Sequence, residues 1–230
     1  MTISNSNSHN ANNKQAVSVT PSTSHQPLTT SHLRSADRIR LGLDASLRVP
    51  SCAVATNAGI VRRAIVGKPT EKFSSLIRDT LFEAHVRLDE LEEIVVSVGP
   101  GSQMGTRTTV ATGNALALAL GIPISGVLSV DALAAGAPVS ESLNAAVSDG
   151  RGRWYVAAYK WEDDKLQRLG GLQLSDELPP DALLSTETDS AESGEERLGA
   201  SGILVIADKH RHLLRQSFVQ EVRPYERGEG

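Results

Sequence analysis

Hydrophobic and polar positions change their period several times along the chain, and each change marks an expected element. Short apolar runs rich in β-branched residues predict strands at 38–44, 51–56, 60–66, 94–98, 122–127, 143–148, 153–161 and 203–206. Apolar residues recurring at three- and four-residue steps predict helices at 71–86, 106–120 and 130–137. Because a strand, a helix and a returning strand follow one another over 94–127, we expect a mixed or parallel sheet and an α/β fold.

The same pattern divides the chain into a tail and a two-part body. Residues 1–37 are dominated by Ser, Asn, Thr, His, Gln and Pro and have little to bury, which predicts a disordered polar tail. A first domain is expected over 38–137, opening with three antiparallel strands in a meander. A smaller, shortened second domain follows over 138–230, in which 175–197 is acidic and Ser-rich and predicts a loop with little helix.

Composition narrows the classes of function. The chain has 230 residues, 40% of them hydrophobic, which is enough for a real core. Aromatic residues make up only 3% and the net charge is −4, so we expect no base-stacking surface and no direct binding of tRNA. The lone Cys52 excludes an internal disulfide. The chain has no 18-residue apolar run and no signal peptide, which favours a cytoplasmic protein without a membrane segment.

The most informative stretch is the glycine-rich loop between strand 94–98 and helix 106–120. It carries glycines at 99, 101 and 105, with Ser102 and Arg107 among them. This spacing fits neither the Walker loop nor the dinucleotide fingerprint. Three roles stay open on spacing alone: a structural turn, a bound anion or nucleotide, and a partner surface. We expect Ser102 to cap the helix rather than act as a nucleophile, and Arg107 to form a salt bridge.

Two histidines, His210 and His212, form an H-x-H motif after the run 203–206. Two imidazoles without a placed third ligand do not define a metal site, so we expect solvated loop residues and no metal.

Several motifs together resemble the bacterial TsaB (YeaZ) family. The loop matches the family signature G-P-G-S-x-T-G-x-R at Gly99, Pro100, Gly101, Ser102, Gly105 and Arg107. Residues 41–46 resemble the family's first strand, and 113–124 its alanine-rich helix and following strand. Residues 148–155 resemble its D-A-R-x-G-E-x-Y strand, and 222–227 its closing P-x-Y-x-R. The resemblance is carried chiefly by residues 39–137, and it implies a duplicated ribonuclease-H-like fold of the actin, sugar-kinase and Hsp70 superfamily, with a reduced second domain.

The resemblance also implies a role. TsaB is the non-catalytic partner of TsaD, which transfers threonylcarbamoyl to adenosine 37 of tRNA, and TsaE joins them as an ATPase. It implies no cofactor, metal or catalytic residue in this chain. ATP-using relatives carry Asp-x-Gly-Thr after the first strand, whereas Asp44 is followed here by Ala45 and Ser46, so Asp44 is expected to be a strand-end hydrogen-bond acceptor.

In that family the two helices of the first domain form the partner contact. We therefore name six candidate interface residues, which are equally suited to packing on the parent sheet: Phe73, Leu76, Ile77, Ala111, Gly113 and Ala117. Relatives also self-associate through these helices, so a homodimer is an alternative. The alternatives for function are an active ATP-dependent phosphotransferase or acyltransferase, and an orphan interaction module that has lost TsaD. Departures from the family pattern at Gln103, Met104 and Pro69-Thr70, and the short second domain, bear on partner affinity rather than on the fold.

Overall fold

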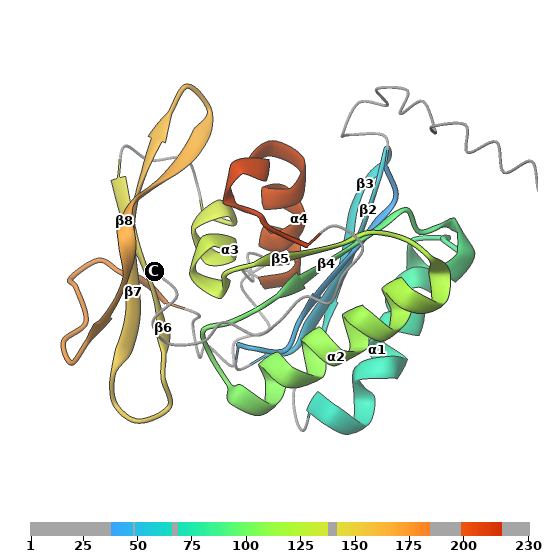
Figure 1. Ribbon diagram of the computed structural model, residues 1–230, viewed down its shortest axis with the longest axis horizontal. Helices are drawn as coiled ribbons and strands as arrows, with labels where there is room; N and C mark the ends of the chain where they lie inside the picture. The colour runs from blue at the N-terminus through green and yellow to red at the C-terminus, as the bar shows by residue number, and fades with distance from the viewer. Residues whose placement is uncertain (1–37, 48, 66–68, 138–141, 185–198, 218–230) are drawn as a thin grey trace, which may run out of the picture. The chain divides into compact units, whose positions relative to one another are not determined.

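The computed structural model describes residues 38–47, 49–65, 69–137, 142–184 and 199–217. The predicted tail of residues 1–37, most of the acidic stretch and the closing motif at 222–227 lie outside these residues. Within them, the chain forms two β-sheets with helices packed on them (Figure 1). The predicted α/β class is confirmed.

The first sheet has six strands in the order β10-β5-β4-β1-β2-β3. Their bounds are β1 Arg40–Asp44, β2 Ser51–Thr56, β3 Gly59–Ala64, β4 Glu93–Ser97, β5 Ile124–Val127 and β10 Arg215–Ser217. β1, β2 and β3 form the predicted antiparallel meander, while β1, β4 and β5 run parallel. A central parallel core of this kind needs cover on both faces.

Strand alternation explains which helix covers which face. Val96 and Ile94 of β4 point toward α2 (Gln103–Leu120), where they lie in the space that a Cβ on Gly113 would enter. Gly42 of β1 points to the opposite face, against Ala200 of α4 (Gly199–Lys209). α1 (Pro69–Glu83) lies beside α2 (Figure 1). The core therefore lies between α1 and α2 on one side of the sheet and α4 on the other.

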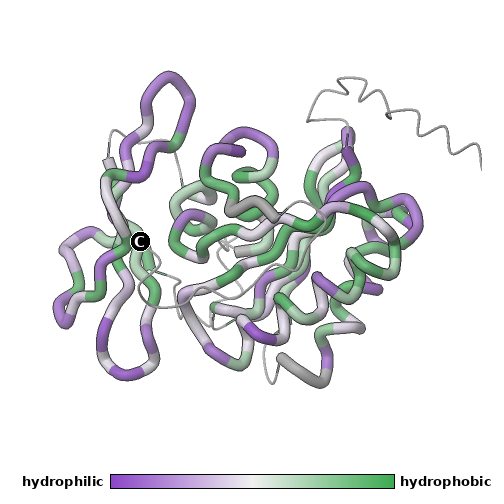
Figure 2. Tube along the Cα trace, in the orientation of Figure 1, coloured by the Kyte–Doolittle hydropathy of each residue, from purple (hydrophilic) through white to green (hydrophobic). Residues whose placement is uncertain are grey.

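The second sheet has four strands in the order β8-β7-β6-β9. They are β6 Ser142–Ser148, β7 Trp154–Glu162, β8 Lys165–Ser175 and β9 Leu183–Leu184. The short helix α3 (Ser129–Ala135) packs between this sheet and α4. Figure 2 shows the central strands of the first sheet as largely hydrophobic and the turns of the second sheet as hydrophilic.

One strand expectation was wrong. The run 203–206, expected to be a buried strand, is the middle of helix α4. Ile203, Leu204 and Ile206 are buried, and a short run of continuous apolar residues has no periodicity that separates a strand from a buried helix. Gly202 decides the packing, because a Cβ there would collide with the backbone of Ala132 in α3.

Residues 199–217 also return to the first sheet. α4 covers its second face, and β10 pairs with β5 at the edge. The expected second domain was continuous in sequence over 138–230. Its last described segment, residues 199–217, nevertheless packs with the first sheet. Two 3-10 turns complete the described elements, η2 (Leu88–Glu90) and η3 (Arg211–Leu213). None of the described helices combines the length and hydropathy needed to span a bilayer.

Candidate functional site

The glycine-rich loop starts helix α2. Ser102 is the N-cap: its side-chain oxygen accepts a hydrogen bond from the Gly105 N–H at 3.2 Å, and its carbonyl accepts from Thr106 N–H at 2.8 Å. The first bond uses an N–H group that a helix start leaves unpaired, and the second is the first backbone bond of the helix itself. The predicted capping role of Ser102 is confirmed, and its hydroxyl is engaged in the cap.

The glycines let the loop pack against its own chain. A Cβ on Gly105 would collide with the carbonyl of Ala45, and one on Gly101 would collide with the carbonyl of Ser46. The Ser102 N–H donates to that same Ser46 carbonyl at 2.7 Å. The turn after β1 therefore occupies the space that glycines open in a nucleotide-binding loop. Of the three roles open for this loop, the geometry favours a structural turn.

A buried polar cluster lies beneath the loop, where β1, β4 and α3 meet. Asp44 is fully buried at the end of β1, and its Oδ1 accepts from the Ser46 N–H at 2.8 Å and from the Ser46 hydroxyl at 2.6 Å. The hydroxyls of Ser46, Ser97 and Ser129 form a triangle with edges of 2.7–2.9 Å. Among the residues that the structure describes, the second oxygen of Asp44, Oδ2, has no hydrogen-bond partner within contact distance.

Burial dominates the titration of Asp44. Desolvation raises the pKa of this carboxyl above 3.8, while the hydrogen bonds from Ser46, Leu47 and Ser97 oppose the rise. Because three hydroxyls fill the cluster and the glycine loop closes over it, the geometry leaves Asp44 as the acceptor that orders the turn after β1.

Five of the six residues named as a partner contact are buried. Phe73, Leu76, Ile77 and Ala117 are 2–6% exposed in the core, and Gly113 lies against β4. Only Ala111 of the six is exposed. The alternative role of these five, packing on the parent sheet, is the one the structure shows for them.

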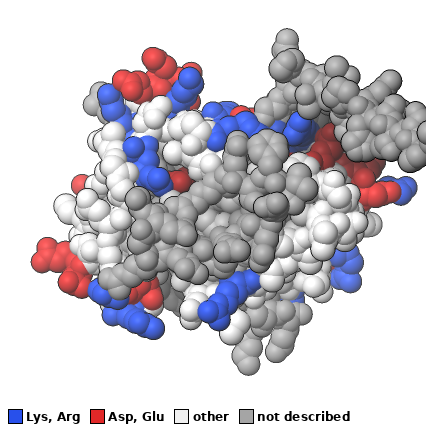
Figure 3. All heavy atoms as spheres, in the orientation of Figure 1, with Lys and Arg blue, Asp and Glu red and all other residues white. Residues whose placement is uncertain are grey.

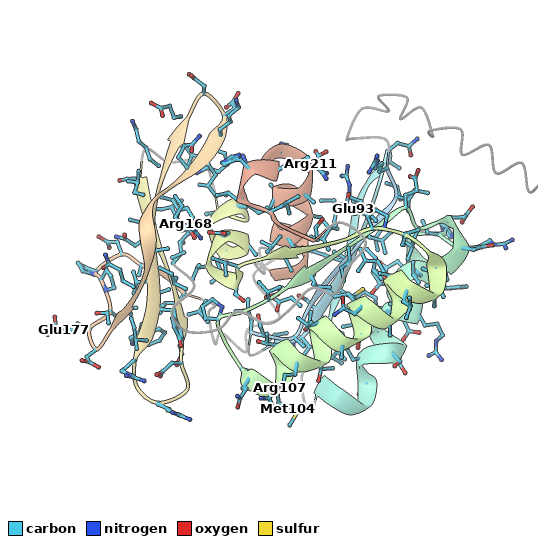
Figure 4. The ribbon with its side chains drawn as sticks, viewed as in Figure 1. Glu93, Met104, Arg107, Arg168, Glu177 and Arg211 are labelled. Carbon is cyan, nitrogen blue, oxygen red and sulfur yellow. The ribbon has the colours of Figure 1, made fainter. Side chains whose placement is uncertain are left out.

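The opposite side of α2 is apolar and exposed. Met104 is 65% and Leu118 86% exposed, and between them Arg107, Ala111 and Ala115 are also exposed. Their spacing of three and four residues places them on one helix face, called here the outer face of α2. Figure 4 shows Met104 and Arg107 at the start of this helix. On neighbouring α1, Phe82 is 81% exposed.

Sequence reasoning named Ala111 and Met104 on this face but did not name Leu118, because α2 carries two apolar stripes. The first, containing Gly113 and Ala117, fills the core, and the second begins at Met104 and ends at Leu118. The signal available in the sequence was this second stripe, because Met104 and Leu118 lie at helical spacing from the exposed Ala111. The expected salt bridge of Arg107 has no partner among the described residues.

Both histidines after α4 were expected to be solvated, but only one of them is exposed. His210 is fully buried, and its Nδ1 lies 3.3 Å from the Leu166 backbone nitrogen. His212 places Nε2 2.9 Å from the Leu166 carbonyl. The solvated-loop interpretation of His210 is therefore wrong, because α4 carries it under the edge of the second sheet. In the described part of the chain, no group of three or more His, Cys, Asp or Glu side chains is arranged to hold a metal ion.

Charged side chains of both signs are interspersed over the described part of the face in Figure 3. This mixture agrees with the small net charge of −4.

Comparison with known proteins gives consistent relatives. Residues 51–177 match the family described as "TsaD: tRNA N6-adenosine threonylcarbamoyltransferase". The TsaB protein of Bacillus subtilis, named for tRNA threonylcarbamoyladenosine biosynthesis, is 33% identical over 94 residues, 40% of this chain and 41% of that protein. An uncharacterized protein of Mycobacterium tuberculosis is 31% identical over 125 residues, 50% of this chain and 58% of that protein. The chain thus matches less than two thirds of the length of these relatives.

Among solved structures, YeaZ from Pseudomonas aeruginosa superimposes with a TM-score of 0.56 at 25% identity, covering 60% of this chain and 67% of that chain. A second structure, titled as similar to peptidase YeaZ of the same organism, gives the same TM-score at 26% identity.

Proposed function

The chain belongs to the TsaD family, within which its relatives include TsaB (YeaZ) proteins, and from this premise we propose that it is a non-catalytic subunit that binds a TsaD-type partner for threonylcarbamoylation of adenosine 37 in tRNA. The outer face of α2, together with Phe82 of α1, is the contact surface. The exposure of Met104, Leu118 and Phe82 is the observation that carries this proposal, because a partner that covered these apolar side chains would remove their surface from water.

The closed glycine loop supports the non-catalytic part of the proposal. Gly101 and Gly105 use their missing side chains to approach Ser46 and Ala45, and the Ser102 N–H is engaged by Ser46. The loop therefore starts α2 at a fixed position instead of wrapping a phosphate. In the cytoplasm, where we place the protein, this fixed helix presents its outer face to the partner, and a TsaE-type ATPase joins the resulting complex.

The same face suits a second copy of this chain. Met104 and Leu118 are each seven positions from Ala111. In an antiparallel pair of α2 helices centred on Ala111, Met104 of one copy meets Leu118 of the other, and the small Ala111 lets the backbones approach. A homodimer would therefore compete with the partner for this face.

The proposal is tested by measuring binding of the full chain to the TsaD-type protein of the same genome. Leu118→Lys and Phe82→Lys each place a charge in the apolar contact, so we expect each to weaken binding about 30-fold, as for loss of a central interface residue. Leu169→Lys is the matched control, because Leu169 is 51% exposed on β8, away from both helices, and should bind like the wild type.

Two outcomes separate the alternatives. Failure of the wild type to bind at about 10 μM, far weaker than specific complexes, would favour the orphan module. Calorimetric binding of ATP by the purified chain alone would favour an active phosphotransferase or acyltransferase and overturn the non-catalytic role.

A further inference from the structure

Two imidazoles contact the outer edge of the second sheet at one residue of β8. β8 is the edge strand of this sheet, and Leu166 faces Trp161 of β7 in the register of the pair. The Leu166 N–H points to His210 Nδ1 at 3.3 Å, and the Leu166 carbonyl to His212 Nε2 at 2.9 Å. The H-x-H motif thus satisfies both backbone groups of one edge residue, as a further strand would.

These contacts define the protonation of His210. Its Nδ1 must carry a lone pair to accept the Leu166 N–H, so the ring is neutral with its proton on Nε2. Within the described part of the chain, that Nε2 is buried without a hydrogen-bond partner, and so is the indole Nε1 of Trp161. The two rings meet edge-on with centroids 5.2 Å apart. A second proton on His210 would turn Nδ1 from acceptor into donor and place its N–H group against the Leu166 N–H group.

The surrounding charges offer His210 no compensation. On its own segment the near groups are Lys209, Arg211 and His212, all of which are basic. The acidic side chains of the packed elements are already engaged. Asp208 pairs with Arg40, Glu93 with Arg40 and Arg211, Glu162 with Lys160, and Asp131 with Arg168. The turn between β7 and β8 adds Asp163, Asp164 and Lys165, all of them exposed.

We propose that His210 and His212 form a proton-operated latch that holds the hairpin of β7 and β8 against η3. The latch is closed while His210 is neutral and opens when it takes up a second proton. Opening frees the N–H and carbonyl of Leu166 and so uncovers the edge of β8 at this position.

The direction of the pH effect follows from linkage. Burial, with His212 and Lys209, lowers the pKa of His210 below its ordinary 6.5 in the closed state. The open state, with an ordinary pKa, binds the proton more readily. The latch is therefore fully stabilised above pH 6.5 and weakens as the pH falls, by about tenfold in the opening equilibrium per pH unit until the closed-state pKa is reached.

The experiment uses the fluorescence of Trp161 in the full chain. Trp161 and Trp154 are the two tryptophans, so Trp154→Phe leaves Trp161 as the reporter. Lowering the pH from 8 to 5, which brackets the ordinary histidine pKa, is expected to shift its emission to the red and to increase acrylamide quenching, while circular dichroism stays native.

His210→Asn in the same background is expected to remove this response, because an Asn carbonyl can accept at the Nδ1 position and does not titrate. His85→Asn is the matched control, since His85 is exposed beyond the end of α1 and far in sequence from Leu166, and this variant should respond like the parent. An unchanged spectrum in the parent, or an equal response in His210→Asn, would overturn the latch.

Nitrogen-15 NMR of the wild-type imidazoles provides a readout that does not depend on a variant. At pH 8 His210 is expected to show an unprotonated Nδ1 and a protonated Nε2. A protonated Nδ1 would refute the proposal even if the Asn variant fails to fold.

Discussion

At the scale of single residues, glycine has its largest effect where two backbones meet. The Cβ of any other residue at position 105 would enter the space of the Ala45 carbonyl, and the hydrogen bond to the Ser102 cap holds position 105 in place. Backbone cannot move aside as a flexible side chain can. The conformational freedom of glycine matters less at this position than its missing side chain.

We expect Gly105→Ala to lower the free energy of unfolding by about 3 kcal/mol, the upper end for overpacking in a core. Urea denaturation at neutral pH measures the change. Gly171→Ala is the control, because nothing lies within 4 Å of the added methyl group, and its change should stay within about 0.5 kcal/mol. Equal stability of the two variants would mean that the loop does not pack tightly on the turn after β1.

At the scale of elements, the ends of β1 and β4 and the start of α3 are joined by hydroxyl groups around Asp44. Ser46 follows β1, Ser97 ends β4 and Ser129 begins α3. Hydrogen bonds among the three bring these ends together below the glycine loop, and Ser129 also donates its N–H to the Gly99 carbonyl at 2.9 Å. The position of α2 thus depends on a junction of several elements.

Asp44→Asn tests the electrostatics of this junction. Burial raises the pKa of Asp44 in the folded state above its ordinary value of 3.8. Between this ordinary value and the raised pKa, the folded protein binds more protons than the unfolded chain. The wild type should therefore gain stability relative to Asp44→Asn as the pH falls from 7 toward 4, by at most about 1.4 kcal/mol per pH unit. Urea denaturation of both proteins across this range measures the difference, and a constant difference would contradict a raised pKa.

At the scale of the whole described body, a buried ion network connects the first sheet to the last segment. Arg40 Nε lies 3.2 Å from Glu93 Oε2, and both side chains are 2% exposed. Asp208 at the end of α4 and Arg211 of η3 each approach this pair at 3.5 Å. Figure 4 labels Glu93 and Arg211 in this region. Segments distant in sequence are thereby fixed to the start of β1 and β4.

Removing one partner of this network should be costly. Glu93→Leu leaves the Arg40 charge buried without its nearest carboxylate, so we expect the free energy of unfolding to fall by about 3–5 kcal/mol in urea. Arg40→Met added to Glu93→Leu should recover much of the loss, because no fully buried charge is then left uncompensated and the remaining Asp208 and Arg211 are 34% and 41% exposed.

Glu83→Ala is the control for this prediction, since its pair with Arg63 is about half exposed and should contribute less than about 1 kcal/mol. A Glu93→Leu variant as stable as Glu83→Ala would show that the network does not hold these segments.

The sequence by itself determined the elements that are specified by a local hydrophobic period or by a glycine or capping residue at their ends. The strands around 40–64, the β4-α2-β5 crossover and the Ser102 cap follow from alternation, helix spacing and glycine position, which act within a few residues. The resemblance to TsaB likewise came from motifs contiguous in sequence, and the relatives found by comparison agree with it.

Only the tertiary structure decided which side is buried where a segment is apolar on more than one face. The run 203–206 is helical because Gly202 and Ala200 let α4 approach α3 and β1, a contact between distant segments. The same holds for α2, where both faces are apolar and only the position of the sheet shows that Ala117 is buried and Leu118 exposed. His210 is buried for an equivalent reason, since the edge of β8 lies over it. Burial is a property of the assembled chain, so periodicity can indicate an apolar face but not what covers it.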